Sequence, residues 1–451
     1  IPLLYLPPPI MPYRFYGHNY LDKNCLVQIT IGDKAPCQST TRSESVKLYP
    51  SFMAAGHQEN YLNSSPLFKI VITAVPDAAS GPFSIPLPLR DQPLSFAFQA
   101  LSIDTLRLDF SLYPNFGTKT LGRAVALPTL LKKADKARYV LPILDHKLHL
   151  IGEVAFGLNV ITPFSGVTLE VGGAVETYWK STAIPTGDIP RPWSVSTMPQ
   201  GSPRPTDSPP SGQPAEKQDH PLTISSITGD FVYVVVQVTR DMQPVAYPHW
   251  KLPGEKFDLH IPNMTLAQFE KLAVELRRNV DVRKQKPATP AQWYSLSRGS
   301  MLSLAELFLL VPLNVALCLE VACLPHATPD QPPPNINASV DCLLRTIYQK
   351  RPEASANGGR RRIVFTSFSP DVCAALNWKQ PNYPVFFASL CGRKVGGNLS
   401  STVLAHTEDG DERSSSLESA VRFSKANNLL GVSVEADILV NNHLTVLHLR
   451  C

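Results

Sequence analysis

Alternation of apolar and polar residues dominates the first 180 residues of the chain and predicts β-strands. In such a run every second side chain points to the same face, so one face can enter a core while the other meets solvent. The clearest runs cover residues 26–31, 68–73, 105–110 and 148–155. Pro, Gly, Asp and Ser separate the runs, and helical spacing is clear only at 127–136. This pattern is typical of an antiparallel β-sandwich, which we predict for residues 1–180.

The pattern changes between residues 181 and 221, which hold ten prolines among many Ser, Thr, Gly and Gln residues. Apart from Trp193, few side chains of this segment are suited to a core. Burial therefore cannot offset the entropy lost when the segment becomes ordered. We predict a disordered linker over residues 181–221 and a domain boundary there.

From residue 222 onward, apolar runs of strand length alternate with segments of helical spacing. The predicted strands are 231–239, 315–322, 363–367, 385–389, 429–434 and 444–449, and the predicted helices are 266–278, 302–311, 340–350, a short one after Pro370, and 417–427. Thr265 and Gln268 form a capping-box pattern at the start of the first helix. Strand–helix alternation indicates parallel strands joined by crossover helices. The length suits a (β/α)8 TIM-type barrel over residues 222–451 that is incomplete at its first strand.

The apolar stretch at residues 301–324 approaches the length of a membrane span but contains Glu306, Pro312, Asn314 and Glu320. Charged groups are costly at bilayer depth, and proline ends or kinks a helix. We therefore predict a helix, a turn and a buried strand in place of a transmembrane segment.

Charge and cysteine usage narrow the function classes. A net charge of +5 over 451 residues is mild, and the densest basic cluster, residues 360–362, runs straight into an apolar run. We interpret that cluster as the solvated start of a strand and predict no nucleic-acid binding. The eight cysteines include no CxxC pair, and several lie in apolar runs. They predict buried, reduced thiols in an intracellular protein.

The first ten residues are apolar, but prolines interrupt them and no basic leader precedes them. They are therefore a poor signal peptide. The start at Ile1 suggests a fragment of a longer protein.

Several sequence blocks in a fixed order resemble the glycerophosphodiester phosphodiesterase family. The blocks are residues 230–241, 244–250, 317–322, 362–371, 379–387 and 427–431. Upstream, residues 151–156 and 172–181 look like the end of the β-sandwich that precedes the barrel in large fungal members. The chain is most similar to the regulatory branch of that family, in which SPX and ankyrin regions come first. That branch consists of cyclin-dependent kinase inhibitors of the fungal phosphate-starvation pathway.

The resemblance also implies where catalytic groups belong. Active members use a His-Arg-Gly motif and a second His as acid and base, and a Glu-x-Asp pair, a later Glu and a nearby Lys for a divalent metal and the phosphate. No His-Arg-Gly occurs in this chain. The resemblance carries the remaining positions onto Tyr233 and Val235 for the metal pair, Pro248 for the second His, Glu320 for the later Glu and Ala322 for the Lys. A single carboxylate does not make a divalent-metal site.

Each of these positions also has an ordinary interpretation. Residues 234–236, three valines, suit any buried parallel strand. Glu320 is either a relic or the partner of a nearby Arg or Lys. His249 becomes the family's second His only if the alignment slips by one residue, and Trp250 then replaces the acidic neighbour. The remaining candidates favour structural roles: the acids of the β-sandwich, the glycine-rich loop 392–397, and His18, His57, His146, His149 and His220.

We therefore expect a non-catalytic member of the family, the C-terminal part of a phosphate-signalling regulator. Its expected partner is a cyclin and cyclin-dependent kinase complex, its location the cytoplasm or nucleus, and no cofactor is expected. The alternative is an active phosphodiesterase that hydrolyses glycerophosphodiesters to glycerol 3-phosphate and an alcohol, with Mg²⁺ or Ca²⁺ as its metal. A lipid-surface adaptor is the third and weakest interpretation.

Overall fold

The computed structural model of the chain describes fifteen segments. They are residues 20–32, 45–50, 52, 68–76, 82–89, 94–133, 138–167, 169, 231–252, 259–278, 287, 289–323, 335–350, 361–393 and 411–435. The predicted linker at 181–221 and the predicted last strand at 444–449 lie outside these residues.

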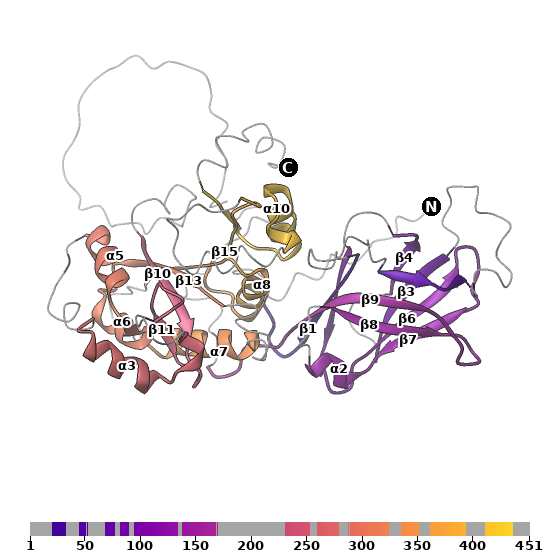
Figure 1. Ribbon diagram of the computed structural model, residues 1–451, viewed down its shortest axis with the longest axis horizontal. Coiled ribbons are helices and arrows are strands. Elements are labelled where there is room, and N and C mark those ends of the chain that lie inside the picture. The colour runs from indigo at the N-terminus through magenta and orange to yellow at the C-terminus, as the bar shows by residue number, and fades with distance from the viewer. Residues whose placement is uncertain are drawn as a thin grey trace, which may run out of the picture.

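An antiparallel β domain forms the N-terminal part (Figure 1). Its elements are β1 (Cys25–Ile31), β2 (Val46–Leu48), β3 (Phe68–Val75), β4 (Phe83–Leu87), β5 (Leu94–Ala100), β6 (Arg107–Pro114), β7 (Gly122–Ala126), α2 (Pro128–Lys133), β8 (Tyr139–Leu144) and β9 (Leu150–Ile161). The strand order is β4-β3-β6-β7-β8-β9-β1-β5, and β2 pairs with β9. The predicted runs at 26–31, 68–73, 105–110 and 148–155 correspond to β1, β3, β6 and β9 within a few residues.

Aromatic contacts bring the two ends of this strand order together. The ring of Phe83 in β4 lies 4.9 Å from that of Phe96 and 5.2 Å from that of Phe98, both in β5. Alternate residues of β3 are buried, as the period-two pattern requires. The strands thus enclose one apolar core, and the predicted β-sandwich is confirmed.

The C-terminal part is an α/β domain built on a second sheet. Its elements are β10 (Phe231–Val238), β11 (Pro244–Ala246), η3 (Ile261–Asn263), α3 (Leu266–Glu275), α5 (Pro290–Gly299), β12 (Leu302–Ser303), α6 (Leu304–Leu310), β13 (Ala316–Val321), α7 (Ile336–Gln349), β14 (Ile363–Ser367), α8 (Pro370–Lys379), β15 (Val385–Ala388), η4 (Glu412–Ser414), α10 (Leu417–Ala426) and β16 (Gly431–Ser433). Strands β10, β13, β14, β15 and β16 run parallel in that order. This confirms the predicted α/β fold class.

Two short strands that the sequence analysis did not predict, β11 and β12, lie at one edge of the sheet. Strand β11 runs antiparallel to β10, and β12 runs antiparallel to β11. Only five residues separate β10 from β11, which is too short for a crossover helix. The Thr239 hydroxyl closes this turn by donating to Asp241 Oδ1 at 2.6 Å.

The apolar stretch at 301–324 divides as predicted into a helix, a turn and a strand. The helix begins at Leu304, two residues later than expected, because Ser303 caps it by accepting from the Glu306 amide at 3.2 Å. Helix α6 ends before Pro312, and β13 follows. Among the described residues, no helix is both long and apolar enough to cross a membrane.

Other element boundaries also differ from the sequence pattern. Helix α5 was not predicted, because its apolar residues are few, yet Thr289 caps it by accepting from the Gln292 amide. Helix α7 starts four residues earlier than predicted, where Asn335 accepts from the Ala338 amide. The capping box of Thr265 and Gln268 at the start of α3 is confirmed.

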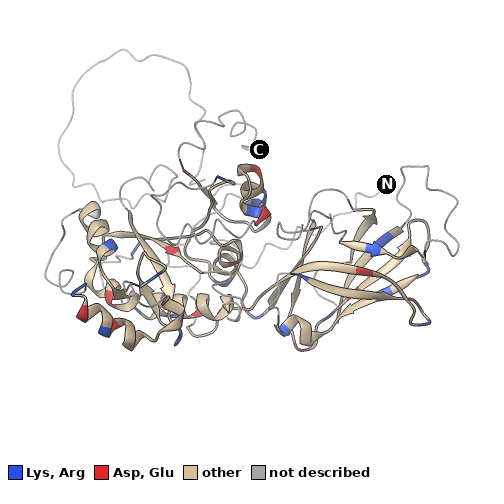
Figure 2. Ribbon diagram, in the orientation of Figure 1, with Lys and Arg blue, Asp and Glu red and all other residues tan. Residues whose placement is uncertain are grey.

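The interpretation of residues 360–362 as a solvated strand start is wrong for Arg361, which is 7% exposed. Its guanidinium donates to the carbonyls of Phe308, Val311, Pro312 and Val315. These carbonyls belong to the end of α6 and the following turn, where no further helical N–H can reach them. Figure 2 shows basic and acidic residues scattered over both domains.

The described cysteines are free. Burial raises the pKa of the Cys318, Cys323 and Cys342 thiols to about 12. Such thiols stay protonated and unreactive at neutral pH, in agreement with the predicted structural role.

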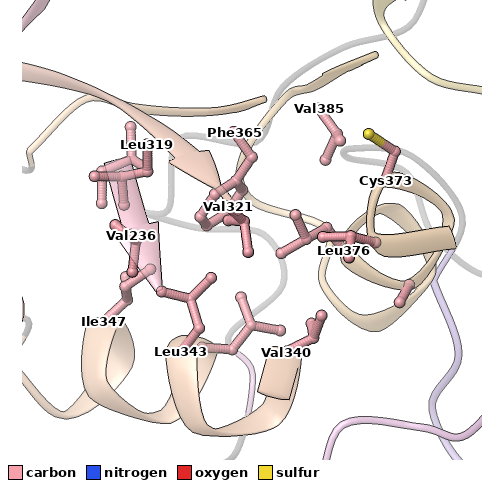
Figure 3. Close-up of a cluster of buried hydrophobic side chains, with 14 of the residues drawn as sticks. Val236, Leu319, Val321, Val340, Leu343, Ile347, Phe365, Cys373, Leu376 and Val385 are labelled. Carbon is pink, nitrogen blue, oxygen red and sulfur yellow. The ribbon is translucent and has the colours of Figure 1, made fainter. Parts of the chain in front are cut away.

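The core of the α/β domain lies between its sheet and helices α7 and α8 (Figure 3). Val236, Leu319 and Phe365 come from successive strands and meet Leu343 of α7 and Leu376 of α8. Helix α8 is buried on nearly every side, because it contacts β14 and β15 as well as α7 and β9 of the β domain.

The two domains are joined by a buried polar contact around Lys379, at the end of α8. The Lys379 side chain is fully buried, and its Nζ donates to Asp341 Oδ1 at 2.9 Å and to Thr162 Oγ1 at 3.2 Å. Thr162 follows β9, whereas Asp341 lies in α7. Burial lowers the pKa of Lys379 and raises that of Asp341, because removal from water disfavours both charges.

Backbone and apolar contacts surround this ion pair. The Leu21 amide donates to the Trp378 carbonyl at 2.7 Å, and Asn337 Nδ2 donates to the Val160 carbonyl at 2.7 Å. Leu26 and Ile161 of the β domain belong to the same apolar cluster as the core of the α/β domain. The core of the α/β domain therefore includes residues of the β domain, which also has a core of its own, and we expect the two domains to unfold together.

We predict that Lys379→Met lowers the free energy of unfolding by about 3 kcal/mol, because Asp341 keeps a poorly solvated charge without its cation. Urea denaturation of the whole chain measures this, and the wild type should unfold in one transition. The double variant Lys379→Met with Asp341→Leu should recover much of the loss, since both charges are then absent.

The matched control is Arg422→Gln, which removes the exposed ion pair with Glu418. That change should cost less than about 0.5 kcal/mol. Two separate transitions in the wild type, or equal effects of Lys379→Met and Arg422→Gln, would contradict a shared core.

Candidate functional site

Tyr233, Val235 and Glu320, three of the positions singled out by the sequence, lie on one face of the α/β sheet. Val235 of β10 pairs in register with Glu320 of β13, and Glu320 pairs with Thr366 of β14. The neighbouring residues Val234 and Leu319 belong to the core beneath the helices. Because side chains alternate along a strand, Tyr233, Val235, Glu320 and Thr366 face the opposite side of the sheet.

Tyr233 and Glu320 contact each other directly. The Tyr233 hydroxyl donates a hydrogen bond to Glu320 Oε2. Glu320 is 1% exposed, and its other oxygen, Oε1, has no hydrogen-bond partner among the described residues. Burial raises the pKa of Glu320 to about 7, since the charged carboxylate loses its hydration.

The interpretation that Glu320 pairs with a nearby Arg or Lys is wrong for the part of the chain described here. Its hydrogen-bonding partner is the phenol of Tyr233, which is 87 residues away in the sequence. A phenol donates a hydrogen bond without adding a charge, so the carboxyl stays close to the balance between its protonated and ionised forms.

The donor set at these positions does not fit a divalent cation. A hard cation needs about six oxygen ligands, and clustered carboxylates supply the charge that replaces its water. Here Tyr233 supplies a phenol already engaged with Glu320, and Val235 supplies no donor. The described residues contain no group of three or more His, Cys, Asp or Glu side chains positioned for a metal ion.

Ala322, where the resemblance leads us to expect the family's Lys, is buried directly after β13. Its amide donates to the Val236 carbonyl at 2.9 Å, and its methyl group offers no contact to an anion. Ala322 thus extends the pairing between β10 and β13 and contributes no charge.

Pro248 and His249 lie in the loop that follows β11. The amide of the preceding residue, Tyr247, donates to the Val235 carbonyl at 3.0 Å, so this loop runs beside β10. His249 is half-buried, and its ring lies 5.5 Å from that of Tyr247. Burial, followed by the charges of Arg278 and Arg298, lowers the pKa of His249. The described contacts of His249 do not include Glu320.

Two buried polar residues were not singled out in the sequence. Gln237 interrupts the valines of β10, and its Nε2 donates to the carbonyls of Tyr247 and His249, each at 2.9 Å. Thr366 sits beside Glu320, and neither Thr366 Oγ1 nor Gln237 Oε1 has a hydrogen-bond partner among the described residues. A polar side chain inside a run of valines was the available signal for Gln237.

The remaining histidine and glycine candidates lie elsewhere. His18, His57 and His220 are outside the described residues, as is most of the loop 392–397. His149 lies beyond the end of β8, where its Nδ1 lies 3.2 Å from Asp145 Oδ2 in an exposed turn. His146 belongs to the same exposed turn, and we continue to expect a structural role for both histidines.

We predict that the chain loses stability as the pH rises through the range set by Glu320. The folded-state pKa of about 7 lies above the reference value of 4.5, so the folded state holds its proton more tightly. The stability associated with this group is complete below pH 4.5 and declines up to pH 7. The total decline is on the order of 3 kcal/mol. Glu320→Gln should abolish it, as measured by urea denaturation at several pH values.

Two further variants sharpen this test. Glu418→Gln removes an exposed carboxyl and should leave the pH dependence unchanged. Tyr233→Phe removes the hydrogen bond to Glu320, so the decline should extend to higher pH. If Glu320→Gln shows the same pH dependence as the wild type, burial does not control this carboxyl.

Known proteins resemble the chain over nearly all of its length. Residues 21–165 match the family described as the GDE1-like C2 domain. The chain is 28% identical to the ankyrin repeat protein nuc-2 of Neurospora crassa, with 96% of this chain and 39% of the relative covered. It is also 28% identical to the phosphate system positive regulatory protein PHO81 of Saccharomyces cerevisiae, with 97% and 37% covered.

A relative named as an enzyme matches a similar region. The chain is 26% identical to the glycerophosphocholine phosphodiesterase GDE1 of Candida albicans, with 95% of this chain and 40% of the relative covered. The chain thus spans about two fifths of the length of these relatives. The expected resemblance is confirmed: the chain combines a match to the GDE1-like C2 domain with similarity to nuc-2, PHO81 and the GDE1 phosphodiesterases over nearly its whole length.

Proposed function

We propose that this chain is the non-catalytic C-terminal part of a phosphate-signalling regulator. The observation that carries the proposal is the hydrogen bond from Tyr233 to Glu320. In this proposal Glu320 is the one carboxyl left of the family's metal-binding residues, and the phenol of Tyr233 contacts it. Tyr233 and Val235 stand where the resemblance places the metal-binding pair, and Pro248 stands in place of an acid–base His.

The similarity to PHO81, a positive regulator of the phosphate system, supports the regulatory role. The expected partner is a cyclin and cyclin-dependent kinase complex, in the cytoplasm or nucleus. In this proposal the α/β domain contributes a folded surface, because a scaffold can keep its packing after its chemistry is lost. The apolar cluster that includes residues of both domains makes the β domain part of that scaffold.

The similarity to the GDE1 phosphodiesterase keeps an enzymatic alternative open to test. We predict that the purified chain, given glycerophosphocholine with Mg²⁺ or Ca²⁺, releases no glycerol phosphate above the background. Each positioned acid or base typically contributes about 10²–10⁴-fold in rate, so Pro248→His alone should not restore turnover. The corresponding region of the Candida albicans relative serves as the positive control.

Turnover by the unmodified chain that disappears in His249→Ala would contradict the proposal. It would show that His249 serves as the second His and that the site is rearranged. Turnover that persists in His249→Ala and in Glu320→Gln would instead indicate a contaminating enzyme.

We also predict that Glu320→Gln leaves the phosphate-starvation response of a fungal cell unchanged, because the proposed role needs no turnover. Phe365→Asp should abolish the response, since Phe365 is fully buried and an unpaired charge in the core unfolds the domain. Reporter expression after phosphate withdrawal measures the response, and immunoblotting measures protein level. Loss of the response in Glu320→Gln at normal protein level would assign a ligand or a reaction to this site.

A further inference from the structure

Three basic residues lie on the loop that follows β11 and at the ends of helices α3 and α5, and the proposed regulatory role does not use them. Arg278 follows the end of α3, Arg298 lies in the last turn of α5, and His249 lies in the loop. The Met301 amide donates to the Arg278 carbonyl at 3.3 Å, which holds the ends of the two helices together. Elements distant in the sequence therefore bring these groups to one place.

Buried neighbours hold two of the three groups in position. Gln237, 1% exposed, anchors the loop through its hydrogen bonds to the carbonyls of Tyr247 and His249. Tyr247 is also 1% exposed, and its ring packs edge-on against the imidazole of His249. Its hydroxyl forms a hydrogen bond with the Arg278 side chain. The arrangement is thus built on buried side chains and does not depend on mobile surface groups alone.

The charges of this cluster are not neutralised within the described residues. Neither Arg278 nor Arg298 forms an ion pair with a described Asp or Glu. Burial lowers the pKa of His249, and the charges of Arg278 and Arg298 lower it further.

A helix C-terminus favours a cation in its last turn, and this effect accounts for Arg298 alone. It does not account for a second guanidinium and an imidazole on the neighbouring turn and loop. Like charges repel one another, so their assembly raises the free energy of the empty cluster. An anion between them would remove that repulsion.

We propose that His249, Arg278 and Arg298 form a binding site for a doubly charged oxyanion of the phosphate monoester class. Two guanidinium groups offer paired N–H donors that match the spacing of phosphate oxygens. The imidazole adds a third donor when it is protonated. His249 and Arg278 are half-buried and Arg298 is exposed, so a ligand in solution can reach all three. This proposal is independent of the regulatory function proposed above.

The test follows the imidazole resonance of His249 by NMR in the whole chain, with His249→Gln used to assign the signal. Inorganic phosphate at constant ionic strength should shift this resonance saturably and raise the pKa of His249. Binding of the anion and of the proton are linked, so each strengthens the other. Arg278→Gln and Arg298→Gln should each weaken phosphate binding by about tenfold, the loss expected for one charge-assisted contact.

Arg277→Gln is the matched control, because Arg277 is an exposed arginine next to Arg278. It should leave the affinity within about twofold, since a single exposed charge contributes little. Equal losses in Arg277→Gln and Arg278→Gln would overturn the proposal, since they would show general attraction to a basic surface. A His249 resonance that does not respond to phosphate, in a chain with unchanged urea denaturation, would also overturn it.

A second arm separates free phosphate from a phosphate carried by lipid. Vesicles of phosphatidylcholine, with and without phosphatidic acid, are sedimented with the wild type and with Arg278→Gln. Sedimentation that requires both phosphatidic acid and Arg278 supports the site with a lipid headgroup as its ligand. Saturable binding of inorganic phosphate without sedimentation supports the site with a soluble ligand.

Discussion

The buried ammonium of Lys379 is the contact on which the arrangement of the two domains depends. Its partners are Asp341 on α7 and Thr162 after β9, so one charge connects both helices of the core to the β domain. A charge removed from water is tolerated only with a close opposite charge and further hydrogen bonds. Any shift of the β domain against α7 or α8 would break this geometry. The domains are therefore held in one arrangement by electrostatics, while the shared apolar cluster supplies the favourable burial.

The same rule shapes the region where the family resemblance places the catalytic groups. A buried carboxyl without a cation nearby is costly when it is ionised. At Glu320 the phenol of Tyr233 donates a hydrogen bond to the carboxyl, and burial raises the pKa of the group, which favours its neutral form. Tyr233 and Val235 add no carboxylate beside Glu320, so one acid has to be satisfied, and the phenol of Tyr233 supplies one of its hydrogen bonds. The site is therefore compatible with stable packing and poorly suited to hold a cation.

Buried polar groups also determine the irregular segments of the α/β domain. Arg361 supplies hydrogen bonds to four carbonyls where α6 ends, and Gln237 supplies two to the loop after β11. In both cases a side chain from a strand region satisfies backbone groups that regular structure leaves open. The loop held by Gln237 carries His249, so the hydrogen bonds that satisfy the loop carbonyls also hold His249 in position.

The sequence by itself determined the elements whose cause is local. Apolar runs located β14 at its observed ends, and the Thr265 and Gln268 pattern located the start of α3, because periodicity and capping act over a few residues. The alternation of strands and helices likewise predicted the α/β fold class. Only the tertiary structure decided that Arg361 is buried, that Tyr233 binds Glu320, and that Lys379 reaches Thr162. The last two pairs are separated by 87 and 217 residues, and no local pattern encodes which partner a polar side chain meets when distant segments pack together.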